Sequence, residues 1–553
     1  MKMADIDLNA VAFPTLDDAQ IGTLSMFGSH RSLHDGEFLW RAGDKEWKFF
    51  VVTIGSVEIS ENSSGTEKIV ARHDRHAFGG DVSLMTGRPA LVSAVARGKT
   101  EVFEIGRQDI KRIMSERPVL GEILLRAFIA RRELLVASGF QGLRVIGSGS
   151  SRDTFRIRDF LARNQVPFTW VDMDRESQVS EMLRGFGLSE SDTPVIICGS
   201  EPLLRNPSTR ALAELTGVRP PLTQKTYDLV IIGGGPAGLA AAVYGSSEGL
   251  ATVVIDSIAP GGQAGTSSKI ENYLGFPTGI SGGELANRAI LQAQKFGAQF
   301  SSPSRVTGLA FDDDVCHVRF DDDGHVLTRC VLIATGADYR KLDLPGRERL
   351  EGSGVYYAAT ATEAQMCRGS DAIVVGGGNS AGQAAMFLSE QTSKVYVLIR
   401  GDDLRKSMSS YLVERIEKAD NIEVLAESEI SNMLGDGRLE ACEIRNCRTG
   451  EVKTMATSAV FTFIGAVPCT DWLPKEIEKD SKGFIKTGRS VMDSPYWTAK
   501  REPFLLETSR PGVFAAGDVR VGSTKRVASA VGEGAIAVMF AHEYLASIVS
   551  IGG

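Results

Sequence analysis

Cysteine is scarce in this sequence, and no two cysteines have the Cys-x-x-Cys spacing of a redox-active pair. Seven cysteines are scattered over 553 residues, which is typical of a chain that folds in a reducing compartment. They are Cys198, Cys316, Cys330, Cys367, Cys442, Cys447 and Cys469. We predict no metal site and no catalytic dithiol.

Excess positive charge and long apolar runs are also missing. The chain has 61 basic and 69 acidic residues, a formal net charge of −8, so nucleic acid is not an expected partner. The start, "MKMADIDLNAVAFPTLDD", contains acidic residues and no long apolar stretch, unlike a signal peptide. Because no run approaches 18 uninterrupted apolar residues, we expect a soluble, cytoplasmic protein with no membrane association.

The length suggests roughly three to four domains. Residues 1–138 alternate apolar and polar positions in short runs and end in helical periodicity, which predicts a small β-barrel with terminal helices. The string "FLWRAGDKEWKFFVVTIGSVEIS", with Gly43-Asp44 and Gly55 at its turns, resembles the entry strands of cyclic-nucleotide-binding domains.

That family binds the cyclic phosphate with an Arg, because a buried anion needs a charged donor. The corresponding string here is "FGGDVSLMTGRPALVSAVA". Asp81 stands for the acidic residue, but the expected Arg position falls at about Val92, and Arg88 comes several residues early. A docking or interaction module is therefore favoured over a cyclic-nucleotide sensor, which stays the alternative.

Residues 142–218 alternate strands and helices, and their order resembles a thioredoxin or glutaredoxin fold. The resemblance implies a turn at Thr193-Pro194-Val195, with Pro194 often cis. The loop before the first helix, "GSGSSRDT", has no cysteine, although Ser150 or Ser151 can cap that helix. The predicted module therefore lacks the reactive dithiol, and residues 218–226 form a linker.

The string "YDLVIIGGGPAGLAAAVYGSSEGLATVVID" predicts a strand, a glycine turn, a helix and a second strand that ends in Asp256. Gly233 permits the tight turn, Gly235 lets a pyrophosphate approach the backbone, and Gly238 lets helix and strand pack closely. An acid at this distance can bond ribose hydroxyls. The predicted cofactor-binding residues are Gly233, Gly235, Pro236, Ala237, Gly238 and Asp256.

A second copy, "DAIVVGGGNSAGQAAMFLSEQTSKVYVLIRG", repeats this pattern, so two dinucleotides are expected. Its second strand ends in Arg400, and an Arg can pair with a 2′-phosphate that an acid would repel. We therefore assign FAD to the first site and NADPH to the second. The predicted residues of the second site are Gly376, Gly378, Asn379, Ser380, Ala381, Arg400 and Arg405.

Several strings in the right order resemble the low-molecular-weight thioredoxin reductases: "GGGPAGLAAA", "PGGQ", "IENYLGFP", "VLIATGADYRKLDLPG", "GGGNSAGQAA", "FIGAVP" and "GVFAAGDVRVGSTKRVASAVGEGAIA". The resemblance covers residues 226 to about 547. It implies two Rossmann-like modules, an FAD-binding one over 226–340 and 468–553 and an NADPH-binding one over 341–467. The whole chain is then a multidomain α/β protein with a β-barrel at its N-terminus.

The same resemblance implies further residues along the flavin. Asp518 can accept from a sugar hydroxyl, and a helix that begins near Val527 directs its positive end at the reducible ring. The residues so implied are Gly262, Gln263, Asn272, Gly517, Asp518, Arg526, Val527 and Ala528.

In these relatives a Cys-Ala-Thr-Cys dithiol follows a Tyr or similar residue. This chain reads Ala358-Ala359-Thr360-Ala361 there, and methyl groups cannot accept electrons. Cys367 lies six residues further on, and an ordinary partly buried thiol is the favoured interpretation over a substitute redox centre.

We therefore predict an NADPH-dependent flavoprotein oxidoreductase that passes a hydride to FAD and the electrons on to an unidentified acceptor. The acceptor is a small redox protein, as in the ferredoxin- or flavodoxin-NADP reductases, or a small disulfide, quinone or oxygen. A non-catalytic flavin and NADPH-binding sensor or scaffold is the alternative. The relatives are dimers, so the resemblance implies a homodimer.

Overall fold

The structure is a computed structural model that describes residues 7–63, 66–137, 143–149, 151–176, 179, 183–184, 187–198, 201–267, 269–312 and 315–549. The predicted boundaries at 138 and 142 and the alternative cap Ser150 lie outside these residues. The chain divides into two compact units. The N-terminal unit comprises residues 1–147, 165–222 and 291–303, and the core unit comprises residues 148–164, 223–290 and 304–553.

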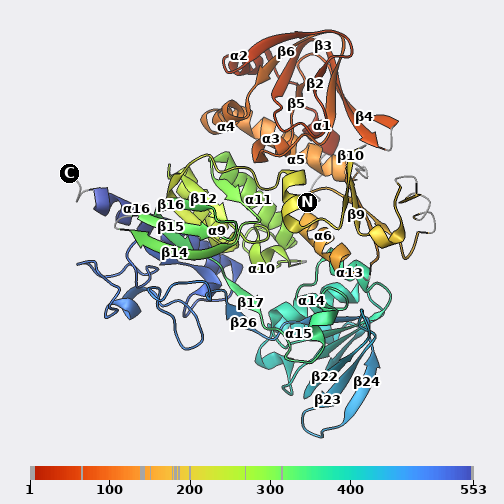
Figure 1. Ribbon diagram of the computed structural model, residues 1–553, viewed down its shortest axis with the longest axis vertical. Coiled ribbons are helices and arrows are strands. Elements are labelled where there is room, and N and C mark those ends of the chain that lie inside the picture. The colour runs from red at the N-terminus through yellow and green to blue at the C-terminus, as the bar shows by residue number, and fades with distance from the viewer. Residues whose placement is uncertain are drawn as a thin grey trace. The chain divides into compact units, whose positions relative to one another are not determined.

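The first part of the N-terminal unit is a β-rich module (Figure 1). Its strands pair in the order β1-β6-β3-β4, with β2 beside β6 and β5 beside β3. Phe49, Phe50 and Phe78 are fully buried. The consecutive Phe49 and Phe50 point to opposite faces of β3, and the Phe49 ring lies 5.6 Å from the Phe78 ring, centroid to centroid. The elements are α1 (Leu8–Ala12), α2 (Asp18–Ser25), β1 (Ser29–Leu33), β2 (Phe38–Trp40), β3 (Phe49–Ser63), β4 (Thr66–His73), β5 (Phe78–Gly79), α3 (Val82–Thr86), β6 (Ser93–Ile105), α4 (Arg107–Glu116) and α5 (Pro118–Ala137).

A second sheet of the N-terminal unit has the strand order β10-β9-β7-β8. Strands β7 and β8 are parallel, and β9 is antiparallel to both β7 and β10. The Thr193–Pro194 peptide is cis, as the resemblance implied. The elements of this part are β7 (Leu143–Gly147), β8 (Thr169–Asp172), η1 (Glu190–Asp192), β9 (Val195–Cys198), β10 (Glu201–Arg205) and α8 (Thr209–Thr216). The unit also includes β13 (Gln299–Ser301), which is not a strand of this sheet.

The core unit contains a mixed sheet in which β12, β11, β16, β15 and β14 are successive neighbours and β27 pairs with β16. Strands β11, β12, β16 and β27 are parallel and almost wholly apolar, as a sheet covered on both faces requires. The elements are β11 (Thr226–Ile232), α9 (Pro236–Ser247), β12 (Thr252–Ile255), α10 (Gly262–Gly265), α11 (Gly282–Lys295), β14 (Val306–Asp312), β15 (Val315–Phe320), β16 (His325–Ile333), η3 (Gly488–Val491), β27 (Val513–Ala515), η4 (Gly517–Val519) and α16 (Val527–Val549).

A second, parallel sheet of the core unit has the order β18-β25-β19-β20-β21, and a hairpin sheet follows as β22-β23-β24. The antiparallel strands β17 and β26 stand where the chain enters and leaves this module. The elements are β17 (Ala337–Tyr339), α12 (Arg347–Leu350), β18 (Val355–Tyr356), α13 (Ala361–Met366), β19 (Asp371–Val375), α14 (Asn379–Ser389), β20 (Lys394–Leu398), η2 (Leu404–Lys406), α15 (Ser410–Glu417), β21 (Ile422–Leu425), β22 (Ser428–Leu434), β23 (Ala441–Asn446), β24 (Val452–Ala456), β25 (Ala459–Thr462) and β26 (Ala466–Pro468).

One helix of the core unit comes from far upstream in the chain. Helix α6 (Arg152–Arg163) begins at Ser151, whose hydroxyl accepts a hydrogen bond from the Thr154 N–H, so one of the two predicted caps is confirmed. Its residues group with the core unit although the strands on either side of it in sequence belong to the N-terminal unit.

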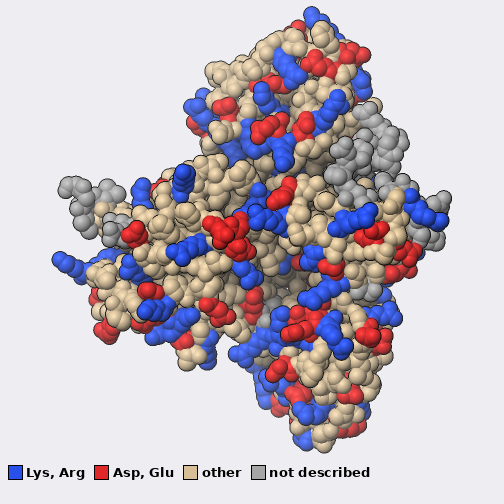
Figure 2. All heavy atoms as spheres, in the orientation of Figure 1, with Lys and Arg blue, Asp and Glu red and all other residues tan. Residues whose placement is uncertain are grey.

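The surface charge is mixed. Figure 2 shows Lys and Arg side chains interspersed with Asp and Glu over the described residues of the face in view. Within the described part of the chain, no helix combines the length and the apolar character needed to cross a membrane. Nor do the described residues contain a group of three or more His, Cys, Asp or Glu that could hold a metal ion.

Candidate functional site

The first glycine turn brings β11, α9 and β16 into close contact. Gly233 has a φ of +105°, and a Cβ there would lie 2.3 Å from the Ala334 carbonyl oxygen. A Cβ on Gly238 would lie 1.9 Å from the Gly233 carbonyl oxygen, so only glycine fits both positions. Gly235 caps α9, and Pro236 occupies the first helical position. The N-terminus of α9 thus faces the cavity described next, where its N–H groups can meet an anion.

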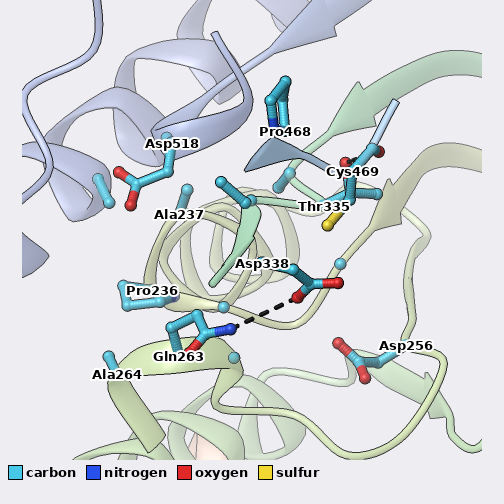
Figure 3. A pocket seen from close by; sticks show the side chains of 18 of the residues that line it. Pro236, Ala237, Asp256, Gln263, Ala264, Thr335, Asp338, Pro468, Cys469 and Asp518 are labelled. Atoms are coloured by element: carbon cyan, nitrogen blue, oxygen red, sulfur yellow. Dashed lines mark hydrogen bonds between the residues drawn. The ribbon is translucent and has the colours of Figure 1, made fainter. Parts of the chain in front are cut away.

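A cavity of about 1340 Å³ lies at this turn, larger than the roughly 300–1,000 Å³ of ordinary small-molecule sites. Residues of both glycine signatures contribute to its wall, and Figure 3 shows part of it. The predicted residues that line it are Gly233, Gly235, Pro236, Ala237, Asp256, Gly262, Gln263, Asn272, Asn379, Ser380, Gly517, Asp518, Arg526 and Val527. The volume and the glycine-lined wall, which combines polar and apolar groups, fit a dinucleotide.

Asp256 directly follows the last residue of β12, and its carboxylate accepts hydrogen bonds from two neighbouring loops. One carboxylate oxygen accepts the Gly234 N–H at 2.8 Å, and the other accepts the N–H groups of Ile258 and Ala259, each at 3.0 Å. The carboxylate therefore ties the glycine turn to the next loop. It also lines the cavity, where an acceptor for ribose hydroxyls is expected.

Asp518 lies on the other side of the cavity from Asp256 (Figure 3). Burial raises the pKa of the Asp518 carboxyl, and the nearby Lys525 ammonium opposes that rise. Helix α16 begins at Val527, as predicted, and Val527 lines the cavity. A Cβ on Gly534 of this helix would lie 2.1 Å from the Ala237 carbonyl oxygen, so α16 and α9 pack at the closest possible distance.

The second glycine turn has similar geometry. Gly376 has a φ of +139°, and a Cβ there would lie 2.4 Å from the Phe463 carbonyl oxygen. Gly378 caps α14, and a Cβ on it would meet no atom within 4 Å. The Asn379 side chain accepts the Ser409 N–H at 2.7 Å, and the Ser407 hydroxyl donates to the Gly377 carbonyl at 2.8 Å. These two hydrogen bonds hold the loop after β20 beside the second glycine turn.

That loop carries the two predicted arginines. Arg400 is exposed and makes no ion pair with any described residue. Arg405 pairs with Glu417 at 2.7 Å and with Asp403 at 3.8 Å, so part of its charge is already compensated. Arg400 is thus the more available partner for a phosphate.

Some predicted residues do not line the cavity. Gly238, Gly376 and Ala381 are packing positions of the two signatures, and Ala528 is exposed on α16. The full set outside the cavity wall is Gly238, Gly376, Gly378, Ala381, Arg400, Arg405 and Ala528.

Sequence reasoning missed the contribution of β17 and β26. The Gln263 amide donates to Asp338 at 3.4 Å, and the Thr335 hydroxyl donates to the Cys469 carbonyl at 2.9 Å. Burial raises the pKa of the Cys469 thiol to about 12, and the neighbouring Asp338 carboxylate adds to the rise. All four residues line the cavity. Asp338 stands in the string "VLIATGADYRKLDLPG" and Cys469 directly follows "FIGAVP", but neither string tells which residue faces the cavity, because that depends on the pairing of β17 with β26.

The segment after β18 lies outside the cavity wall. Ala359 is buried, and the Thr360 N–H donates to the Glu363 carboxylate at 2.8 Å. Glu363 is itself buried, which raises its pKa to about 7. Cys367 is 1% exposed, and burial raises the pKa of its thiol to about 12. The side chain of Cys367 is thus an ordinary buried thiol.

In the β-rich module the acidic residue of the phosphate cassette is already engaged. Asp81 caps α3 by accepting the Ser83 N–H at 2.8 Å and pairs with Arg132 at 3.2 Å. Val92 packs against the hydrophobic core, and the Arg88 guanidinium donates to the Gln165 carbonyl at 3.3 Å. The position expected to hold the phosphate-binding Arg is thus part of the core packing.

Two family models match the chain. Residues 227–534 match the pyridine nucleotide-disulphide oxidoreductase family, and residues 30–117 match the cyclic nucleotide-binding domain.

Similar proteins cover the same part of the chain. The thioredoxin reductase of Treponema pallidum is 37% identical over 319 residues, which are 58% of this chain and 97% of the relative. Thioredoxin reductase 1 of Saccharomyces cerevisiae is 33% identical over 330 residues, which are 58% and 98%. Among solved structures, the Lactococcus lactis thioredoxin reductase (FR conformation) is 30% identical with a TM-score of 0.53, over 58% of this chain and 99% of that chain. The T. acidophilum thioredoxin reductase is 29% identical with a TM-score of 0.52, over 59% and 100%.

Proposed function

The chain belongs to the pyridine nucleotide-disulphide oxidoreductase family, and on this premise we propose that it is an NADPH-dependent flavoprotein oxidoreductase without an internal dithiol. FAD and NADPH are its cofactors. The observation that carries the proposal is that both glycine signatures line one cavity, whereas the segment 358–361 has no thiol. When bound, FAD accepts a hydride from the nicotinamide.

The chain's own residues bind and orient the cofactors. The N-terminus of α9 at Gly235 and Pro236 would hold the FAD pyrophosphate, and Asp256 would accept from ribose hydroxyls. The N-terminus of α16 at Val527 would face the redox ring and stabilise added negative charge. At the second signature, the open space in front of Gly378 and the exposed Arg400 suit NADPH.

The cysteines support an external acceptor. The six cysteines whose side chains the structure describes, from Cys316 to Cys469, are all free thiols. Cys469 lines the cavity, but its thiol has a raised pKa, and a thiolate is the reactive form. The chain's own residues thus offer no internal acceptor, and a bound flavin would pass its electrons to a separate molecule, either a small redox protein or a small disulfide, quinone or oxygen. The homodimer, the cytoplasmic location and the absence of a nucleic-acid partner stay predictions.

An anaerobic titration with NADPH tests this proposal. Full reduction should consume about one equivalent of NADPH per FAD, because the flavin is the one two-electron store. Alkylation of the thiols should leave flavin reduction intact, and thioredoxin should not be reduced. A second equivalent that disappears in Cys367→Ser or Cys469→Ser would show that a displaced thiol replaces the missing dithiol. Flavin reduction without turnover on any acceptor would instead support the sensor.

The two N-terminal modules are proposed to be non-catalytic. The strand order β10-β9-β7-β8, with β7 and β8 parallel and β9 antiparallel to β7, supports a thioredoxin-like module, whose Ser151 cap stands where a dithiol loop is expected. The engaged Asp81 and the packed Val92 support an interaction role for the cyclic-nucleotide-binding-like module. Calorimetry should detect weak or no binding of cyclic AMP to the full chain. Micromolar affinity would contradict this role and make Arg88 the first residue to mutate.

A further inference from the structure

Helix α6 is anchored on the NADPH-binding module by its first two turns. The Phe155 ring lies 5.7 Å from the Tyr356 ring, centroid to centroid. Arg158 is 2% exposed, and one of its guanidinium nitrogens donates to the Gln365 side chain at 3.0 Å. These contacts place the helix beside the segment that begins at β18.

The other end of α6 contacts the loop that Asp256 organises. Asn164, 3% exposed, follows the last helical residue, and its amide donates to the carbonyls of Phe160 at 2.9 Å and Ile258 at 3.3 Å. The Ile258 N–H is one of the groups that Asp256 accepts. The end of α6 is therefore joined through one residue to the predicted ribose-binding carboxylate.

Arg163, the last residue of α6, lines the cofactor cavity itself. The residues that line the cavity also include Asp256 and Ile258 after β12. Because Asn164, the next residue, donates to the Ile258 carbonyl, and the Ile258 N–H donates to Asp256, Arg163 reaches the cavity near the Asp256 loop. The partner of Arg163 within the helix is Asp159, at 3.7 Å. A guanidinium carries five N–H donors, so this one contact leaves donors for a ligand.

We propose that Arg163 is an FAD-binding residue that serves the adenosine half of the cofactor. This inference rests on the proposed function, since it concerns the same cavity. A guanidinium stacks on flat aromatic faces and donates to neighbouring acceptors, which an adenine base and its ribose both offer. Asp256, the predicted ribose partner, is linked to the end of α6 through Ile258, whereas Asp518 lies across the cavity from Asp256 (Figure 3). A residue more than 60 positions upstream of the first signature thus completes the FAD site.

The test is ligand binding to the flavin-free full-length chain. FAD affinity is measured by flavin fluorescence, and ADP and FMN are used as probes of the two halves of the cofactor. Arg163→Ala should raise the dissociation constants of FAD and ADP by about 10-fold, the loss of one charge-assisted contact. FMN, which lacks the adenosine, should bind as it does to the wild type.

The matched control is Arg156→Ala. Arg156 lies on the same helix and pairs with Asp153 at 3.2 Å, but it does not line the cavity. Its replacement should leave all three affinities unchanged, and thermal unfolding of both flavin-free variants should match the wild type. An Arg163→Ala chain that binds FAD and ADP normally, or that loses FMN equally, overturns the inference. A wild-type chain that fails to bind FAD at all would instead overturn the proposed function.

Discussion

The two dinucleotide modules of the core unit follow the same strand, glycine turn, helix and strand path but differ in how tightly the helix approaches the turn. In the first, Gly238 leaves no room for a Cβ, which would lie 1.9 Å from the Gly233 carbonyl oxygen. In the second, Ala381 occupies the matching position and is fully buried. The same motif therefore tolerates a methyl group in one module and excludes it in the other.

The modules also differ at the end of the second strand. Asp256 accepts three backbone N–H groups, so it is part of the scaffold as well as a candidate ligand for ribose. Arg400 is exposed and forms no ion pair with the described residues. The first module thus builds a fixed site around a structural carboxylate, whereas the second offers a free cation.

The largest effect on stability and FAD binding is expected when the packing difference between Gly238 and Ala381 is removed. Gly238→Ala should destabilise the chain by about 1–3 kcal/mol and release FAD, because the added methyl group overlaps the Gly233 carbonyl. The reverse change, Ala381→Gly, should cost only about 1 kcal/mol, the usual penalty for glycine in a helix. Thermal unfolding and the flavin content of the purified variants measure both effects. Equal stability of Gly238→Ala and the wild type would mean that the two turns are interchangeable.

A smaller effect is expected from removing the charge difference. Arg400→Ala should lower the efficiency of flavin reduction by NADPH by roughly 10-fold, the loss of one charged contact, and leave NADH almost unaffected. Stopped-flow reduction with each nucleotide measures the preference. Arg405→Ala is the control, since the Arg405 guanidinium already pairs with Glu417 at 2.7 Å. A wild type that uses both nucleotides equally, or a larger effect at Arg405, would refute the assignment.

The local motifs of the fold were predictable from the sequence, because glycine turns and buried strands depend on residues close together in the chain. The start of α16 at Val527 and the Ser151 cap of α6 are examples. The same reasoning identified much of the cavity wall, since residues such as Gly235 and Asp518 stand in recognisable strings.

The remaining wall residues were not predictable in this way. Arg163 and Cys469 reach the cavity through tertiary packing, and neither stands in a motif that names its neighbours. The hydrogen bonds from three backbone N–H groups to Asp256 could not be predicted either, because they depend on the path of the loop after β12. Long-range packing, not local preference, decides these positions.

The placement of α6 in the core unit limits how this chain can be divided or rebuilt. The sequence suggests separate, consecutive modules, yet a cut before β11 would remove Phe155, which packs against the Tyr356 ring, and Asn164, which donates to the Ile258 carbonyl. A fragment made from residue 223 onward would therefore expose apolar surface and lose part of its cofactor wall. Helix α6 and the core unit therefore need to be expressed and engineered in one chain.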